Sequence, residues 1–264
     1  MSSDSDTIML AGGDDLRDEL GTAVIGSAVY GRDRVDSTNL EALRLAREGA
    51  PEGTIVVAAT QTAGRGRLGR PWVDVPGGCL LVTALVRPPE GCAGLVTAAA
   101  ALAVAETVRE RLELPALIKW PNDVLIHDRK IAGVLAEGPA AGLVAVGIGV
   151  NVSGSSGDLP EGLRDRAGFL SEEAGAAVTT AGMLRALLPH LDRDYRALHQ
   201  SGECAGLVQR LRGLDYLLGR RVVVRAAGRE IAGEAAGWRD TGALVVRGDS
   251  GALHEFDAGE VTLS

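Results

Sequence analysis

The amino-acid sequence predicts an α+β fold with a small all-β domain at its C-terminal end. Short apolar runs follow one another with short links, longer stretches repeat apolar residues at helical spacing, and after about residue 216 short β-branched runs alternate with glycine-containing turns. Short links favour antiparallel strands, so we expect a sheet with packed helices over residues 34–216 and a separate β-domain over residues 217–264. Residues 1–33 are too few to fold alone and are expected to form a partly disordered extension with one short helix at 14–20.

Two helices and two strands are predicted in the first half of the chain. Thr38 and Glu41 form a capping box, and apolar residues then recur at helical spacing, so a helix begins at Thr38 and ends near Gly49. A β-branched run predicts a buried strand at 54–60, and the run at 79–86 predicts its partner strand. Helical spacing from residue 95 to 112 predicts a helix that packs on the sheet and ends before Pro115.

The second half continues the sheet and then changes to the β-domain. Four strand-like runs follow at 116–120, 122–126, 131–137 and 143–150, the second and third joined by residues 127–130. A helix with leucines on one side follows, from about residue 184 to 198, and Pro189 is expected to kink it. The β-domain is predicted from the runs at 220–226, 229–235, 243–248 and 253–256.

Composition limits the possible functions. Hydrophobic residues make up 46% of the 264 residues but aromatic residues only 3%, which disfavours a stacking surface for single-stranded nucleic acid. The net charge of −8 gives no overall attraction to polyphosphate, so any cationic site must be local. The three cysteines have no metal-ligand spacing, no basic segment precedes an apolar run at the N-terminus, and the uncharged stretches at 91–105 and 138–157 are too short or too broken to span a bilayer. We therefore expect a cytoplasmic protein that does not enter a membrane.

The segment 64–72, GRGRLGRPW, combines glycine and arginine in a way that indicates an anion-binding loop. It matches G-x-G-x-x-G, but Gly69 leads into a proline-rich segment that cannot form the helix of a dinucleotide fold, and Arg70-Pro71 replaces the Lys-Ser/Thr of a P-loop. Glycine allows close approach of the backbone and arginine supplies a planar charged fork for phosphate or carboxylate. Trp72, at the end of the loop, could stack on a base. The alternative is a solvated basic loop.

Two further polar segments end predicted strands. Lys119, Asn122 and Asp123 surround Trp-Pro in KWPND, where polar groups are expensive to bury without partners, although a polar hairpin turn is an alternative. Lys130 precedes a small residue at a turn and would, taken alone, be a solvated lysine. In GIGVN at 147–151, two glycines in an apolar strand indicate either close approach of a ligand or a glycine bulge.

Taken in order, these segments resemble those of the biotin protein ligases. The matching segments are DSTN at 36–39, QTA at 61–63 with the loop 64–72, KWPND at 119–123, RKIAGVLAE at 129–137 and GIGVN at 147–151. The resemblance spans roughly residues 33–264. It implies a catalytic domain with a mixed sheet, related to class II aminoacyl-tRNA synthetases, followed by an SH3-like barrel.

The resemblance also implies an ATP-dependent reaction in two steps. Biotin and ATP, with Mg²⁺, would give biotinyl-5′-AMP and pyrophosphate, and a lysine of a biotin carboxyl carrier domain would then take the biotin as an amide. Because the first step brings a carboxylate onto a polyphosphate, cations must screen the repulsion between them. The alternatives are a lipoate-type protein ligase on the same fold, which would need a His-Asp pair that does not follow Trp72, and a noncatalytic biotin sensor or RNA-binding module.

Roles for individual residues follow from the same resemblance. Lys130, Arg67 and Asp123 would be catalytic, with Asp123 orienting either the incoming lysine or a Mg²⁺-bound phosphate. The implied biotin-binding residues are Ser37, Thr38, Gln61, Gly64, Arg65, Arg67, Lys130, Gly133 and Gly147. The implied nucleotide-binding residues are Arg65, Arg67, Trp72, Lys119, Asn122, Lys130 and Asn151. No set of protein metal ligands is implied.

The sequence departs from the pattern of the family at two places. Many relatives carry an N-terminal winged helix-turn-helix, for which residues 1–33 are too short and too acidic, so we expect no binding to DNA. The segment Ala167-Gly168-Phe169-Leu170 stands where relatives often read Ala-Thr-Ser-Leu, and its part in an adenine pocket stays open.

Overall fold

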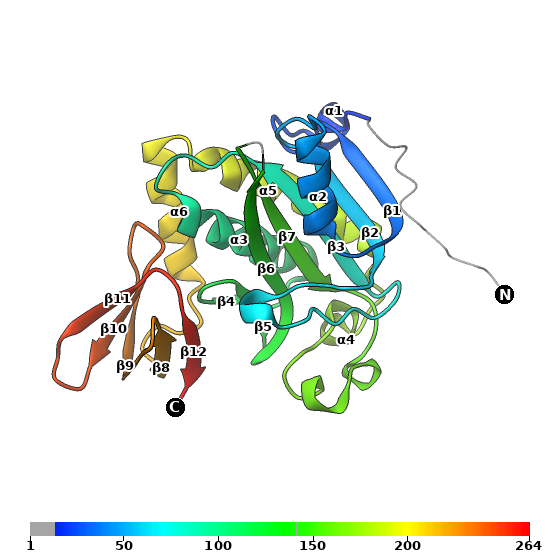
Figure 1. The fold of residues 1–264 in the computed structure, drawn as a ribbon. Helices are drawn as coiled ribbons and strands as arrows, with labels where there is room; N and C mark the ends of the chain where they lie inside the picture. The colour runs from blue at the N-terminus through cyan, green and yellow to red at the C-terminus, as the bar shows by residue number, and fades with distance from the viewer. Residues whose placement is uncertain (1–13, 141) are drawn as a thin grey trace.

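Two β-sheets organise the chain in the computed structural model, which describes residues 14–140 and 142–264 (Figure 1). The first is a seven-stranded sheet with the order β1-β2-β3-β7-β6-β5-β4. Its strands are β1 (Val29–Val35), β2 (Ile55–Gln61), β3 (Cys79–Val86), β4 (Leu117–Lys119), β5 (Asp123–Ile126), β6 (Arg129–Ala140) and β7 (Leu143–Asn151). β1 and β2 run parallel and all other neighbours are antiparallel, so the sheet is mixed as expected.

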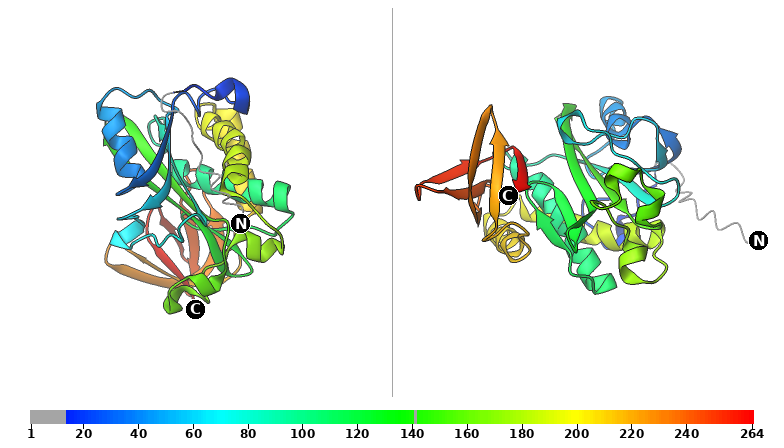
Figure 2. Two further views of the ribbon diagram at one scale, coloured as in Figure 1. Left: turned by 90° about the vertical axis from the view of Figure 1, so that its right-hand side faces the viewer. Right: turned by 90° about the horizontal axis from the view of Figure 1, so that it is seen from below.

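Helices cover both faces of this sheet, because residues of each central strand alternate between two apolar clusters. Helices α3 (Ala93–Leu112) and α5 (Thr180–Ala197) pack on one face, where side chains such as Val57 and Val82 join the main core. Helix α2 (Thr38–Arg47) packs on the other face, against Val56 and Leu85. Figure 1 shows α2 in front of the strands with α3 and α5 behind them, and the side view in Figure 2 separates the layers.

Strand β1 was not expected, and the predicted boundary between residues 33 and 34 falls inside it. The strand pairs with β2 from Val29↔Ile55 to Val35↔Gln61, and Ile25, just before it, is fully buried. Short helix α1 (Arg17–Leu20) precedes it. The sequence of β1 mixes four charged and polar positions with few apolar ones, as an edge strand tolerates, so it shows little strand periodicity. Residues 1–13 lie outside the described part of the chain.

A buried carboxylate of α5 holds the segment before β1. Asp192 is only 3% exposed, and its carboxylate accepts hydrogen bonds from the backbone N–H groups of Ala23, Val24 and Ile25 at 2.7–3.1 Å. These donors have no strand or helix partner of their own, so the carboxylate substitutes for secondary structure. The segment is therefore part of the domain built on the first sheet.

The Asp192→Ala variant is expected to lose about 3 kcal/mol of unfolding free energy, because three backbone N–H groups, of which that of Ile25 is buried, lose their acceptor. Urea denaturation followed by circular dichroism would measure the loss. Asp240→Ala is the matched control, since Asp240 is 86% exposed and pairs with Arg212 at the surface; its change should stay within about 0.5 kcal/mol. Equal stability of the two variants would contradict the structural role of Asp192.

The start of α2 differs from the predicted capping box. Ser37 occupies the N-cap position, and Thr38 is already the first helical residue. Its backbone N–H and its hydroxyl both donate to Gln61 Oε1, at 2.8 and 3.1 Å. Glu41 pairs with Arg32 and Arg44 and so does not fold back on the helix terminus. A partner from the neighbouring strand has replaced the local cap, an interaction that sequence spacing cannot reveal.

Two other local features also differ from the expectation. The β5–β6 connection is a two-residue turn, with φ of 47° at His127 and 68° at Asp128, so Arg129 and Lys130 belong to β6. Helix α5 contains Pro189 and continues beyond it, and the kink there stays a prediction. Helix α6 (Ser201–Gly213) follows and was not expected, because its apolar residues are fewer and less regular. The remaining helices are the short α4 (Leu170–Ala174) and single turns at 67–69, 156–158 and 161–163.

The second sheet is antiparallel, with the order β11-β10-β9-β8-β12, and lies beside α6 and the lower edge of the first sheet (Figures 1 and 2). Its strands are β8 (Arg221–Ala226), β9 (Arg229–Trp238), β10 (Leu244–Gly248), β11 (Leu253–Phe256) and β12 (Glu260–Leu263). The last strand was not predicted, because only Val261 of its four residues is buried. Its pairing with β8 brings the C-terminal end next to the first sheet.

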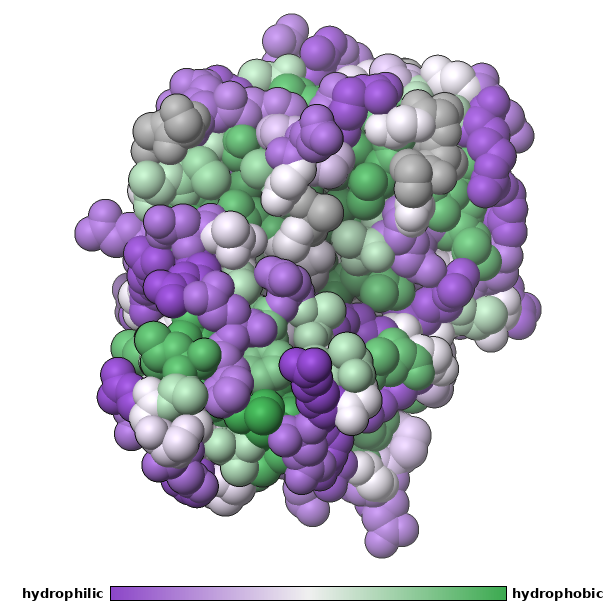
Figure 3. Space-filling view, turned by 60° about the vertical axis from the view of Figure 1, so that its left-hand side comes forward, coloured by the Kyte–Doolittle hydropathy of each residue, from purple (hydrophilic) through white to green (hydrophobic). Residues whose placement is uncertain are grey.

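On the face shown in Figure 3, hydrophobic areas are interrupted by hydrophilic side chains. No helix in the described ranges combines the length and the apolar character that crossing a bilayer requires.

Candidate active site

A cavity of about 740 Å³ opens on the α2 face of the first sheet. Helix α2 covers only part of this face, and the strands beyond it carry glycine where a side chain would fill the space. Gly133 of β6 and Gly149 of β7 are direct neighbours across the two strands, and Gly147 pairs with Leu135. These three glycines form the floor of the cavity.

The glycine floor holds two side chains at close range. A Cβ atom at Gly149 would lie 2.6 Å from the indole of Trp72, and one at Gly133 would lie 3.1 Å from the same ring. A Cβ atom at Gly147 would lie 2.2 Å from the carboxamide oxygen of Asn39. The two glycines of GIGVN are therefore explained by close approach of protein side chains, and the bulge interpretation is wrong, since β7 pairs with β3 in continuous register.

The Gly/Arg loop, residues 64–72, folds back on itself over the floor. Gly66 N–H donates to the Arg70 carbonyl at 2.7 Å, and Trp72 N–H donates to the Gly64 carbonyl at 2.9 Å. The reversal passes through left-handed backbone at Leu68 (φ 57°) and Gly69 (φ 73°). Leu68 is 69% exposed at the tip of the loop. This ribbon carries Trp72 inward to the floor and points Arg67 into the cavity.

The centre of the cavity is cationic. Lys130 Nζ lies 2.6 Å from Asp123 Oδ1 and 5.6 Å from the centroid of the Trp72 ring. Burial lowers the pKa of Lys119, against the opposing effect of Asp123, and its ammonium has no hydrogen bond or ion pair among the described residues. Burial likewise lowers the pKa of Arg67, which still remains charged. Buried cations with so little compensation attract anions.

Two contacts orient Arg67. Its Nη1 donates to Asn122 Oδ1 at 3.2 Å and its Nη2 donates to the Gly259 carbonyl at 3.1 Å. Asn122 is itself held, because its Nδ2 donates to the Val134 carbonyl at 2.8 Å. The guanidinium is thus fixed jointly by the first sheet and by the residue that precedes β12.

Polar groups at the start of α2 form one end of the cavity. Ser37, Thr38 and Gln61 line it together, and the Gln61 carboxamide oxygen is already bound by Thr38. Arg65 lies at this side, with its Nη2 3.2 Å from Glu137 Oε1. Hydroxyl, amide and carboxylate groups suit the recognition of a neutral polar head group.

The structure brings most of the predicted site residues together. The predicted residues that line the cavity are Ser37, Thr38, Gln61, Arg65, Arg67, Trp72, Lys119, Asn122, Asp123, Lys130, Gly133 and Gly147. Both lysines of the chain are among them. Gly64 and Asn151 do not line it.

Asn151 and Gly64 act instead on the cavity wall. Asn151 is buried at the end of β7, where its Nδ2 donates to the Gly168 carbonyl at 3.0 Å. A Cβ atom at Gly64 would lie 2.7 Å from the Trp72 carbonyl, so this glycine allows the loop to close. Neither Asn151 nor Gly64 borders the cavity itself.

Several lining residues were not predicted from the sequence. They come from distant segments: Asn39, Asp128, Leu163, Arg166, Tyr216 and the stretch 259–263. Asn39 stood inside DSTN and could have been included. The rarity of lysine, at positions 119 and 130 only, was a second available signal. The remaining residues have no local pattern that marks them.

The C-terminal sheet closes the lower side of the cavity. Glu260 of β12 pairs with Arg70 of the loop, and this hydrogen bond lowers the pKa of the Glu260 carboxyl. Tyr216 Oη donates to Asp128 Oδ1 at 2.7 Å, with the Arg220 guanidinium 4.0 Å from the Tyr216 ring centroid. Both sheets therefore contribute to one site.

Cys79 is excluded as a nucleophile at this site. It lies in β3 beneath Trp72, and burial raises the pKa of its thiol to about 11. At pH 8 its thiolate fraction is therefore about 0.1%, far below that of an exposed cysteine. We expect iodoacetamide to label Cys79 only after unfolding, while Cys92 and Cys204, both partly exposed, react in the native protein. Peptide mass spectrometry would check this, and native labelling of Cys79 would contradict it.

The fold and the site together define a class of protein: an α+β domain with a cationic cavity, suited to anionic ligands, beneath a Gly/Arg loop. Comparisons with known proteins agree. Residues 31–153 match the biotin/lipoate A/B protein ligase family, and residues 217–264 match the biotin protein ligase C-terminal domain.

Individual relatives show the same family. The chain is 38% identical over 234 residues to the biotin-[acetyl-CoA-carboxylase] ligase of Paracoccus denitrificans, covering 83% of this chain and 93% of that protein. It is 35% identical over 252 residues to the bifunctional ligase/repressor BirA of Bacillus subtilis, covering 92% of this chain and 77% of that protein. The structure of biotin protein ligase from Aquifex aeolicus in complex with biotin and ATP superposes with a TM-score of 0.78 at 28% identity, over 89% of this chain and 99% of the other. The chain belongs to the biotin protein ligase family.

Proposed function

We propose that the protein activates biotin with ATP and transfers it to a lysine of the biotin carboxyl carrier domain of a carboxylase. The observation that carries the proposal is the group of Arg67, Lys119 and Lys130 at the centre of one cavity, under a loop that can cover two anions. Family membership supports it, as do the biotin and ATP bound to the Aquifex aeolicus relative.

Biotin is proposed to bind at the α2 end of the cavity. Its ureido head would meet Ser37, Thr38 and Gln61, and its carboxylate would reach Lys130 and Arg67. The remaining biotin-binding positions in this proposal are Gly133, through the backbone, and Arg65 and Gly147 beside the ring; Gly64 serves biotin indirectly, by letting the loop close. The polar end and the cationic centre match the two polar ends of biotin.

ATP is proposed to bind with its α-phosphate at Lys130 and Arg67. Trp72, Leu163 and Ala167 belong to one apolar cluster and would contact the adenine. Lys119 and Arg65 would add positive charge. Asn122 acts by orienting Arg67, and Asn151 by holding the wall at Gly168, so both serve the nucleotide indirectly.

The first step forms one bond and breaks another. A carboxylate oxygen of biotin attacks the α-phosphorus of ATP, an O–P bond forms, and the bond to the β-phosphate oxygen breaks, releasing pyrophosphate. Two anions must approach within bonding distance, and the reaction centre gains negative charge. Lys130 and Arg67 stabilise that charge from fixed positions, which is the main catalytic contribution available to side chains here.

The second step transfers the acyl group. The ammonium of the acceptor lysine first gives a proton to water. The neutral ε-amine then attacks the biotinyl carbonyl carbon, the C–O bond to AMP breaks, and a second proton passes to water as the amide forms and AMP leaves. Asp123, whose side chain is 28% exposed beside Lys130, is the carboxylate that can hold the incoming ammonium group. Fixing the amine near the carbonyl would convert the step into an effectively unimolecular one.

Magnesium is proposed to enter with ATP. Over the described ranges no three His, Cys, Asp or Glu side chains are grouped to hold a metal. Mg²⁺ commonly keeps several waters and binds substrate phosphates, so its ligands would come mainly from ATP and water. ATP as a substrate and cysteines without disulfide partners suit a reaction in the cytoplasm.

Mass spectrometry of the protein with biotin, ATP and Mg²⁺, with and without a biotin carboxyl carrier domain, tests the proposal. We expect biotinyl-5′-AMP in the first sample and one added biotin on the carrier lysine in the second. Lipoate replaces biotin in a parallel sample and should give neither product. Because the ligase has only two lysines, biotin found on the ligase itself can be assigned to Lys119 or Lys130. Absence of both products from a folded protein, or preference for lipoate, would overturn the proposal.

A further inference from the structure

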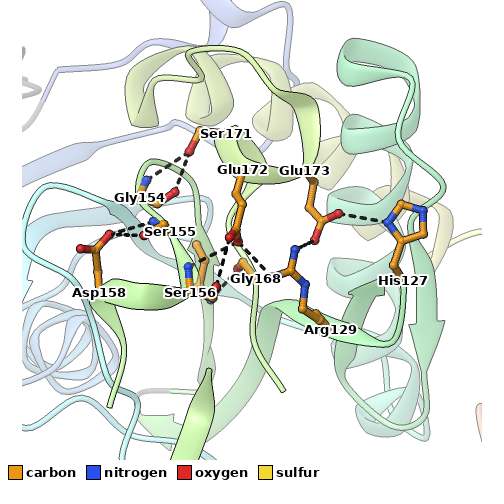
Figure 4. A network of polar contacts seen from close by, with 11 residues as sticks. His127, Arg129, Gly154, Ser155, Ser156, Asp158, Gly168, Ser171, Glu172 and Glu173 are labelled. Carbon is orange, nitrogen blue, oxygen red and sulfur yellow. Dashed lines mark hydrogen bonds and ion pairs between the residues drawn. The ribbon is translucent and has the colours of Figure 1, made fainter. Parts of the chain in front are cut away.

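Two carboxylates of α4 hold the outer wall of the cavity, outside the ligand-lining set. Glu173 Oε1 lies 2.5 Å from Arg129 Nη2, and Glu173 Oε2 lies 3.0 Å from His127 Nδ1. Glu172 Oε2 lies 3.1 Å from Arg129 Nη1. Figure 4 shows the two carboxylates side by side, with Arg129 between them and the β5–β6 turn.

Glu172 and Ser171 link α4 to the loop on its other side. Ser156 Oγ donates to Glu172 Oε1 at 3.0 Å, and Ser171 bonds both the N–H and the carbonyl of Gly154 at 3.1 Å (Figure 4). The Glu173 side chain is only 5% exposed, whereas that of Glu172 is 29% exposed. Burying a carboxylate costs much free energy of desolvation unless the charge is paired. Because Glu173 is the more deeply buried of the two and pairs with Arg129, we regard it as the centre of this network.

The segment 163–168 forms one wall of the cavity, and its Gly168 lies against the Glu173–Arg129 ion pair. A Cβ atom there would lie 3.0 Å from Glu173 Oε1 and 3.3 Å from Arg129 Nε, so a side chain would press on the pair. This accounts for glycine at the position where the family resemblance leads one to expect threonine. The neighbouring Phe169 is fully buried and fixes the segment in the core beneath Trp72.

The wall is joined to the backbone of Lys130 itself. Lys130 N–H donates to the Arg166 carbonyl at 2.8 Å, and Gly168 N–H donates to the Lys130 carbonyl at 3.0 Å. Arg166 and Ala167, between these bonds, line the cavity. A shift of the wall therefore moves the backbone of Lys130. Loss of the ion pair with Glu173 would also release the side chain of Arg129, the residue directly before Lys130.

We propose that Glu173 is a positioning residue for the nucleotide: through Arg129 it fixes the 163–168 wall and the backbone of Lys130 in the geometry that ATP requires. This inference rests on the proposed function. Glu173 does not touch the cavity, and it acts on catalysis through Arg129 and Gly168. Its effect falls mainly on the nucleotide end, because Arg166 and Ala167 of the wall line the cavity there. The head-group end at Ser37, Thr38 and Gln61 is built on α2 and β2, and the Lys130 ammonium, which would serve both substrates, is also held by Asp123.

Steady-state kinetics of the Glu173→Gln variant test the inference. Glutamine keeps the shape but loses the charge, so we expect the KM for ATP to rise on the order of tenfold through misplacement of the wall. The KM for biotin should change less than about twofold. Glu230→Gln is the matched control, since Glu230 pairs with Arg225 in the exposed C-terminal sheet and should leave both constants unchanged.

A double-mutant cycle separates positioning from loss of stability. If Glu173 acts through Arg129, the double variant Arg129→Gln/Glu173→Gln should have a KM for ATP no higher than that of the more affected single variant. Arg129→Lys serves as the second variant if Glu173→Gln does not fold, since it retains charge but loses the fork that binds two carboxylates. It should raise the KM for ATP in the same selective way.

The outcomes are distinguishable. An unchanged KM for ATP in a folded variant, beside a wild-type protein that makes biotinyl-5′-AMP, would overturn the positioning role alone. Equal rises of both KM values in proportion to lowered thermal stability would show a purely structural role and would also overturn it. A wild-type protein that makes no adenylate would overturn the proposed function and this inference with it.

Discussion

Replacing Lys130 by alanine is expected to slow biotinyl-5′-AMP formation by about 10³-fold while the fold remains intact, because a cation that stabilises charge in the transition state is removed. Lys130 Nζ is the lysine ammonium paired with Asp123 at the cavity centre, and its side chain is 35% exposed. A pair of this exposure contributes at most about 1 kcal/mol to stability. The catalytic loss should therefore far exceed any loss of stability.

Quenched-flow measurement of adenylate formation from labelled ATP would give the rate, and thermal unfolding would verify the fold. Arg239→Ala is the control, since it removes a cation from the exposed ion pair with Glu255, and neither residue lines the cavity. Its adenylation rate should equal that of the unmodified protein. A folded Lys130→Ala variant with unimpaired adenylation would exclude Lys130 from the reaction.

The Arg67→Gly variant is expected to release biotinyl-5′-AMP about 100-fold faster, equivalent to roughly 3 kcal/mol. Arg67 is the loop residue that points into the cavity, held by Asn122 and by the Gly259 carbonyl. Glycine removes the guanidinium that would contact the adenylate and also removes one of the two links between the loop and the C-terminal sheet, leaving the Arg70–Glu260 pair. Both losses favour escape of the intermediate.

Dissociation of isolated biotinyl-5′-AMP, followed by tryptophan fluorescence or by trapping with excess biotin, measures this effect. Trp72 lies in the same loop and provides the signal. Arg34→Gly is the control, since Arg34 is an exposed residue of β1 that does not line the cavity. This variant should leave the dissociation rate unchanged. A dissociation rate that is the same in the Arg67→Gly and unmodified proteins would rule out the retaining role.

Sequence patterns predicted the elements whose signal is local. The helix at 95–112 and the strands at 54–60 and 79–86 were recovered as α3, β2 and β3, because each buries a continuous or periodic set of apolar side chains. β1, β12 and α6 escaped prediction. The two strands lie at sheet edges with few buried residues, and α6 has a weak apolar stripe, so tertiary pairing decides their conformation more than their own sequence does.

The candidate site shows the same division. Arg67, Lys119, Asp123 and Lys130 could be chosen from the sequence, because charged residues beside glycine or at the ends of buried strands are chemically unusual. Asn151 was assigned to the nucleotide but binds the Gly168 carbonyl. Contributions from Tyr216, Arg166 and residues 259–263 could not be foreseen, because no local pattern marks side chains that meet only when two sheets pack together.

By itself, the sequence determined the α+β class, the Gly/Arg loop, the cationic residues and the resemblance to the biotin protein ligases, since all of these depend on residue types and short spacings. Only the tertiary structure decided which groups meet. It placed Gly133 and Gly149 under Trp72, Gly147 against Asn39, Glu260 against the loop and Glu173 against Arg129. The physical reason is that hydrogen bonds, ion pairs and close packing act over a few ångströms in space, whereas their partners are separated by up to 192 residues in the chain.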